Sequence, residues 1–225
     1  MKSKIKSLKM KKISCILVFI FVSIIAFSQQ DPEAKKILDK LSNKTKSYNT
    51  IEADFKVDYV NLKDNFKNSS TGKITMQGEK YRLIFMDTEA FFDGKTLWSY
   101  LKDANEVNIS EPEDDDSDLF NNPKKIFTIY EKDFKYQLIS QNTEGEISYA
   151  IIDLYPFDLE KDYSRIRLQI NTSLYQLKSA TIFGKDGSNY SVAITNYKTN
   201  VSVSPDFFTF NEINYPNIET IDMRW

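Results

Sequence analysis

The sequence predicts a single α+β domain built mainly from an antiparallel sheet, with one helix before the strands and one among them. Aromatic residues make up 14% of the 225 residues, chiefly Phe (16) and Tyr (13), whereas Gly (6) and Pro (6) are few. Phe and Tyr favour the pleated surface of a sheet. Apolar and polar residues alternate through about ten or eleven segments, and no linker-like stretch divides the chain.

The N-terminus has the pattern of a secretory signal peptide. The first 12 residues contain six lysines and no acidic residue, and 15 largely apolar residues follow. That run is shorter than the roughly 20 residues of a membrane span, and small residues, the last being Ser28, follow it as at a cleavage site. We therefore expect residues 1–28 to be cleaved off and residues 29–225 to form the mature domain in the periplasm. Met10 would serve equally well as a start, and Cys15, the one cysteine, is removed with the leader.

Two helices are expected in the mature chain. The first begins at Pro32 after a capping Asp31, ends near residues 45–48, and has one apolar face made of Ala34, Ile37, Leu38 and Leu41. The second runs from Pro123 to Tyr130. It follows the acidic loop Glu111–Asp118, which we interpret as solvated because it lacks the ligand spacing of a calcium loop.

Strands with a period of two are expected in the first half from Ile51, over Thr71–Gln77 and over Glu106–Ser110. Lys80–Met86 is apolar at nearly every position, which indicates a strand covered on both faces. Between two aromatic runs, Asp93-Gly94 predicts a hairpin with a two-residue type I′ turn.

The second half reads almost entirely as strand, in an antiparallel meander with one solvated face. A short terminal strand is expected over Phe207–Phe210 and an irregular tail after Asn214. The five preceding strands are expected over Lys135–Gln141, Glu146–Tyr155, Tyr163–Asn171, Tyr175–Gly184 and Asn189–Lys198.

The composition argues against catalysis and against nucleic acid as a partner. The chain has no histidine, and its mature part has no cysteine, which excludes Ser-His-Asp and Cys-His catalysis and dithiol chemistry. Asp93, Asp153 and Asp158 are available as paired carboxylates, but each has a turn or surface explanation, so we expect no enzyme, no metal and no cofactor. Without six leader lysines the mature chain carries 24 basic and 32 acidic residues, a net charge of −8 that suits neither nucleic acid nor an anionic membrane surface.

An apolar hollow is the remaining option, because a large antiparallel sheet with surplus aromatic rings and short amphipathic helices can enclose one. At this point the chain resembles the periplasmic outer-membrane lipoprotein carriers of the LolA family, over essentially the whole mature sequence. The resemblance rests on an ordered set of segments: Ala53-Asp54-Phe55, Gly72-Lys73-Ile74, Lys80-Tyr81-Arg82-Leu83, Asp93-Gly94-Lys95-Thr96-Leu97-Trp98-Ser99-Tyr100, Asn105-Glu106-Val107 and Pro205-Asp206-Phe207-Phe208-Thr209-Phe210.

The resemblance implies an unclosed antiparallel barrel of about eleven strands with a helical lid over an apolar cavity that takes acyl chains. It also implies acylated lipoproteins as cargo, an inner-membrane ATP-driven complex as donor, and an outer-membrane acceptor that the sequence does not specify; we expect a monomer. A free lipid as cargo, or a lipoprotein-sensing module with the same fold, are the alternatives. The predicted cavity lining is Phe55, Val57, Tyr59, Tyr81, Leu83, Phe85, Phe92, Trp98 and Tyr100, with Ile126, Phe127 and Ile129 from the lid.

Overall fold

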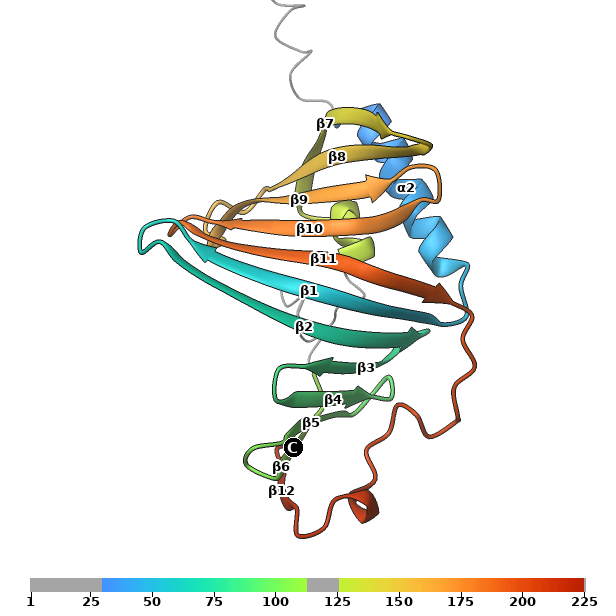
Figure 1. Cartoon of the computed structure of the whole chain (residues 1–225), viewed down its shortest axis with the longest axis vertical. Coiled ribbons are helices and arrows are strands. Elements are labelled where there is room, and N and C mark those ends of the chain that lie inside the picture. The colour runs from blue at the N-terminus through green and yellow to red at the C-terminus, as the bar shows by residue number, and fades with distance from the viewer. Residues whose placement is uncertain (1–29, 113–125, 225) are drawn as a thin grey trace, which may run out of the picture. The chain divides into compact units, whose positions relative to one another are not determined.

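The computed structural model describes residues 30–112 and 126–224, and its compact unit begins at Pro32. A curved sheet dominates this unit, with one α-helix, α2 (Pro32–Lys46), on one side of it (Figure 1). The strands are β1 (Ile51–Asn61), β2 (Phe66–Gln77), β3 (Lys80–Phe85), β4 (Thr88–Phe92), β5 (Leu97–Leu101), β6 (Glu106–Ser110), β7 (Phe134–Glu144), β8 (Ile147–Pro156), β9 (Tyr163–Asn171), β10 (Gln176–Gly184), β11 (Ser188–Thr199) and β12 (Glu219–Asp222).

These twelve strands form one sheet in the order β12-β6-β5-β4-β3-β2-β1-β11-β10-β9-β8-β7, so that β12 and β7 are its two edges. Neighbours pair antiparallel except β12, which runs parallel to β6. Among the described residues the edges do not pair with each other, which confirms the predicted unclosed barrel with one strand more than expected. The β10–β11 ladder spans only five residue pairs, from Ser179↔Ala193 to Phe183↔Asn189, whereas β1 and β11 pair over their whole lengths.

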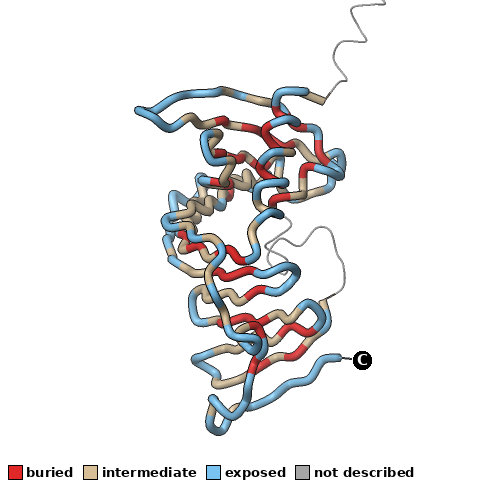
Figure 2. The backbone as a smooth tube through the Cα atoms, turned by 90° about the vertical axis from the view of Figure 1, so that its right-hand side faces the viewer, coloured by how far each residue is buried: buried red, intermediate tan, exposed pale blue. Residues whose placement is uncertain are grey.

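The first helix begins and ends where the sequence predicts. Its apolar face is buried, and it packs against β7 and β10. Beneath it, the inward residues of β8 and β9 form a filled core in which Ile152, Leu154, Ile166, Leu168 and Ile170 are completely buried. Figure 2 shows these buried stretches along the strands. No helix among the described residues is long and apolar enough to cross a membrane.

The expected second helix is different in the structure. Residues 123–125 lie outside the described part, and the rest forms two short 3-10 turns, at Ile126–Phe127 and at η3 (Ile129–Glu131), separated by Thr128. The predicted α-helix is therefore wrong for residues 126–130, because side-chain burial rather than continuous helical hydrogen bonding holds this segment on the sheet.

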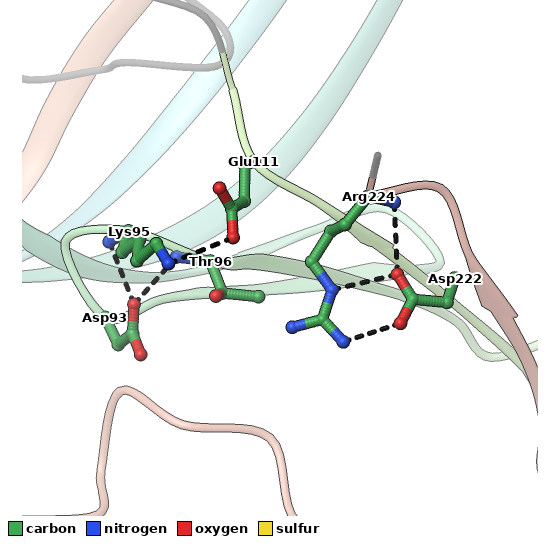
Figure 3. Close-up of polar contacts among 6 residues, drawn as sticks. All are labelled: Asp93, Lys95, Thr96, Glu111, Asp222 and Arg224. Carbon is green, nitrogen blue, oxygen red and sulfur yellow. Dashed lines mark hydrogen bonds and ion pairs between the residues drawn. The ribbon is translucent and has the colours of Figure 1, made fainter.

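The hairpin between β4 and β5 is present, but its turn is shifted by one residue. Asp93 pairs with Thr96 through a backbone hydrogen bond of 3.3 Å, so the central residues are Gly94 and Lys95, and Gly94 takes a φ of 101°. The Asp93 Oδ1 atom accepts hydrogen bonds from the backbone N of Lys95 (2.9 Å) and of Thr96 (2.8 Å), as Figure 3 shows. A positive φ at the first central residue is the position of glycine in a type II′ turn, so the predicted type I′ turn is wrong.

The C-terminal segment departs most from the predictions. Phe207–Phe210 forms turns rather than a strand, with Phe208 and Phe210 buried. The tail predicted to be irregular contains η4 (Glu212–Asn214) and then β12, which pairs with the edge of β6. Near its end, Arg224 forms a two-pronged ion pair with Asp222, close to the β4–β5 turn in Figure 3. The segment thus seals one edge of the sheet.

The outer face of the sheet, which points away from α2 and the main core, bears on the predicted coverage of β3 and on the predicted surface position of Asp153. The double coverage expected for β3 is supplied there by the C-terminal segment, since the Arg82 guanidinium lies between the rings of Phe91 (4.7 Å) and Phe207 (4.9 Å). Asp153 is not a surface carboxylate: it is 2% exposed and accepts two hydrogen bonds from Arg167, at 2.7 and 2.8 Å. Of the acidic loop, residues 113–118 lie outside the described part.

Candidate functional site

An apolar cavity of about 350 Å³ lies on the inner face of the sheet, beside the filled core under α2. Its walls come from β1, β2, β3, β10 and β11, and Ile126 and Phe127 close part of it. Such a volume is at the lower end of the roughly 300–1,000 Å³ of ligand pockets. The lining consists of Ile51, Ala53, Phe55, Val57, Tyr59, Asn68, Ser69, Ser70, Ile74, Met76, Leu83, Phe85, Met86, Ile126, Phe127, Leu177, Ala180, Ile182, Tyr190, Val192, Ile194 and Tyr197.

Strand alternation explains why β1 supplies so much of the wall. Its odd-numbered residues from Ile51 to Tyr59 share one face, and all five of them line the cavity. Next to β1, Gly72 of β2 lies between Phe55 and Phe85, with which it is paired in the sheet. The two phenyl rings meet at 5.8 Å over this glycine, and together they form part of the cavity floor.

One end of the cavity is polar and reaches the surface. There the Tyr59 hydroxyl lies 3.2 Å from Ser188 Oγ, and the Tyr59 ring packs at 4.8 Å against Tyr190. Four lining residues at this end are exposed: Met86 (60%), Tyr190 (42%), Asn68 and Ser69. Asn68, Ser69 and Ser70 of β2 also line this end, so hydrogen-bonding groups meet the hydrocarbon wall here. At the opposite end, burial raises the pKa of Tyr197 above its usual value.

Polar contacts fasten α2 to the 3-10 segment beside the cavity. The Tyr130 hydroxyl donates a hydrogen bond to Asp39 Oδ1 (3.0 Å), and Lys46 Nζ lies 3.4 Å from Glu131 Oε1. Burial, and secondarily the bond to Asp39, raises the pKa of Tyr130 above its usual value. These two contacts join α2 to residues 130 and 131, the part-buried hydrogen bond of Tyr130 contributing more than the exposed ion pair.

Seven of the twelve predicted lining residues do line the cavity: Phe55, Val57, Tyr59, Leu83, Phe85, Ile126 and Phe127. Tyr81, Phe92 and Ile129 belong to the same hydrophobic core but pack outside the cavity wall, with Tyr81 and Phe92 in ring contact at 5.3 Å. Their predicted place in the wall is therefore corrected to a place in the core.

Trp98 and Tyr100 lie on the opposite face of the sheet. They pair with outward-facing neighbours, Phe91 opposite Trp98 and Val107 opposite Tyr100. With Phe210, these residues form a second hydrophobic cluster under the C-terminal segment. Their predicted cavity placement is wrong because both faces of β4 and β5 are apolar, and Leu97 rather than Trp98 points into the main core.

Sequence reasoning missed the wall supplied by β10 and β11. Tyr190, Val192 and Ile194 of β11 line the cavity, and so do Leu177, Ala180 and Ile182 of β10. The period-two alternation in β11 is readable in the sequence and could have predicted its inward face. What the sequence does not show is that β11 pairs with β1, which brings this face to the cavity.

Within residues 30–112 and 126–224 there is no group of three or more His, Cys, Asp or Glu side chains placed to hold a metal ion. The most deeply buried carboxylate, Asp153, lies on the outer face and is engaged by Arg165 and Arg167. The cavity itself therefore presents hydrocarbon, three small polar residues of β2 and tyrosine hydroxyls.

Comparison with known families matches residues 24–152 to the family described as outer membrane lipoprotein carrier protein LolA. The chain belongs to this family. A comparison with curated protein sequences found no match.

Several solved structures are similar to this chain at low sequence identity, and the first of them supports the fold. An uncharacterized conserved protein from Thermus thermophilus is 10% identical, with a TM-score of 0.57 over 84% of this chain and 99% of that one. A LolA superfamily protein from Nitrosomonas europaea is 12% identical, with a TM-score of 0.43 over 79% and 97% of the two chains. The Mycobacterium tuberculosis lipoprotein LppX is 12% identical, with a TM-score of 0.45 over 77% and 98%.

Proposed function

We propose that this LolA-family protein is a non-enzymatic carrier that binds the acyl chains of lipoproteins in its cavity and shuttles them from the inner to the outer membrane. The observation that carries the proposal is the hydrocarbon-lined cavity of about 350 Å³, which stays hollow beside a completely filled core. The working compartment is the periplasm, entered by secretion across the inner membrane with cleavage of the leader near Ser28, which lies outside the described residues. Donor and cargo are an inner-membrane ATP-driven complex and acylated lipoproteins.

Free-energy magnitudes explain why such cargo needs a carrier. Each methylene taken out of water contributes about 0.8 kcal/mol, so a 16-carbon chain carries roughly 12 kcal/mol of hydrophobic free energy. A cavity at the lower end of the ligand-pocket range shields part of a chain and leaves part at the open end. Partial shielding suits a carrier, because cargo that is fully gripped would not be released.

The test is a binding measurement on delipidated protein with palmitate and with an N-palmitoylated peptide, together with mass spectrometry of ligands that co-purify. A Val192→Trp variant places a ring in the cavity, and Ser191→Trp, one residue earlier and outside the cavity lining, is its matched control. We expect Val192→Trp to reduce acyl binding at least tenfold while Ser191→Trp binds normally.

Two results would count against the proposal. Equal binding by both variants would show that acyl chains do not occupy this cavity. Recovery of free lipids alone from cells, with no acylated polypeptide, would replace lipoproteins by a free lipid as cargo.

A further inference from the structure

The hairpin of β1 and β2 extends past the end of β3 and leaves part of β2 without a neighbour on one side. β2 pairs with β1 from Phe66 to Met76, but with β3 only from Gly72 to Gln77. Over residues 66–71, therefore, no described strand pairs with β2 on the side away from β1. In Figure 1 this hairpin projects beyond the β3–β4 turn.

On this side no described strand pairs with residues 66–71. The Ser69 N–H donates a hydrogen bond to Asn68 Oδ1 at 2.7 Å, so a local side chain accepts where a partner strand would, and an added strand would replace it. In an antiparallel pair successive residues direct their N–H and C=O groups to alternate sides, so those of Lys67 and Thr71 point the same way as those of Ser69. The segment has no proline and no acidic residue, and five of its six residues are exposed.

The unpaired edge is continuous with the cavity. Asn68, Ser69 and Ser70 belong to both, and they form the polar end where the hydrocarbon wall stops. A ligand whose acyl chains lie against Phe55 and Phe85 would therefore leave the cavity alongside this edge. The six residues span about 20 Å, enough for an extended peptide of similar length.

We propose that Phe66–Thr71 is a peptide-binding edge, to which the extended N-terminal segment of an acylated polypeptide adds as a further antiparallel strand while its acyl chains occupy the cavity. The inference rests on the proposed acyl-binding function. It gives a binding site to the polypeptide part of a lipoprotein, which a free lipid lacks. Main-chain hydrogen bonds supply affinity in strand addition and do not depend on peptide sequence. The edge would thus distinguish lipoproteins from free lipids without restricting which lipoproteins are carried.

The experiment compares palmitate with a palmitoylated hexapeptide of Ser and Ala residues, and with six versions of that peptide that each carry one N-methylated amide. We expect the unmodified lipopeptide to bind about tenfold more tightly than palmitate, and N-methylation to weaken binding about fivefold at every second position. A period of two is expected because alternate amides face the strand. On the protein, Ser69→Pro removes one edge N–H, and Ser69→Ala, which keeps it, is the control.

The outcomes separate the two proposals. If lipopeptide and palmitate bind equally and the N-methyl series is flat, the peptide edge is overturned while acyl binding in the cavity stands. If neither ligand binds, both proposals fail. Because the N-methyl series leaves the protein unchanged, the result does not depend on the folding of Ser69→Pro.

Discussion

Gly72 lies under the two rings of the cavity floor, and its replacement by Ala should disturb them. A Cβ atom at this position would lie 2.4 Å from Phe55 Cζ and 2.8 Å from the backbone O of Ile84. Carbon atoms pack at about 3.5–4.0 Å, so the ring has to move by roughly 1.1–1.6 Å. The Ile84 carbonyl belongs to the sheet and cannot yield, whereas the cavity offers space for the ring.

The expected result of Gly72→Ala is therefore both a loss of stability and a smaller cavity. Overpacking of this kind costs about 1–3 kcal/mol, which for a domain of this size lowers the melting temperature by about 2–12 °C. Urea unfolding and palmitate titration measure the two effects. Adding Phe55→Leu should recover much of the stability, because the shorter side chain no longer meets the new methyl group.

A Gly72→Ala protein with unchanged unfolding free energy and unchanged palmitate affinity would refute this reasoning. So would a double variant that is less stable than Gly72→Ala alone, because the loss would then not come from the contact with Phe55.

Three further predictions concern other parts of the domain. Trp98→Ala should cost less unfolding free energy than the about 3–5 kcal/mol of a fully buried ring, because Trp98 is only half-buried in the outer cluster, and it should leave palmitate affinity unchanged. A selective loss of palmitate binding would contradict this placement. Asp153→Ala leaves Arg165 and Arg167 without their buried partner and should lower the unfolding free energy by about 1–3 kcal/mol in urea. The loss is smaller than for a fully buried ion pair because both arginines are about a third exposed. An unchanged urea midpoint would argue that these ion pairs do not stabilise the fold. Burial raises the pKa of Tyr197 in the folded state, so the stability that its neutral phenol contributes is fully present below the usual pKa of 10.0 and is lost as pH rises through the folded-state pKa. In unfolding measurements over a pH series, Tyr197→Phe should therefore lose less stability above about pH 10 than the parent protein does.

The sequence predicts the first helix and eleven of the twelve strands, β1 to β11, because local patterns control them. The capped start at Pro32 and the alternation of Ile166, Leu168 and Ile170 each identify an element and its buried face without reference to distant residues. The same holds for β1, whose inward residues include three of the predicted lining residues, Phe55, Val57 and Tyr59.

The predictions fail where the structure depends on pairing between distant strands, or where both faces of a strand are apolar. A period of two shows that Leu97 and Trp98 face opposite ways, but it does not show which face is the inner one when both are apolar. The aromatic run Phe207–Phe210 has strand-like composition, yet it forms turns, from which Phe210 packs in the outer cluster. Glu219–Asp222 has little apolar character and becomes a strand only because the edge of β6 is within reach.

The short ladder between β10 and β11 has a mechanical consequence. It joins the filled part of the sheet under α2 to the part that carries the cavity, and it does so through five residue pairs although the strands have nine and twelve residues. The described contacts of α2 are mainly with β7 and β10, so the helix packs chiefly on one side of this junction. A twist of the sheet at the β10–β11 junction would break few inter-strand hydrogen bonds. Such a twist would move the cavity walls apart for a larger ligand while the packing of the core under α2 stays unchanged.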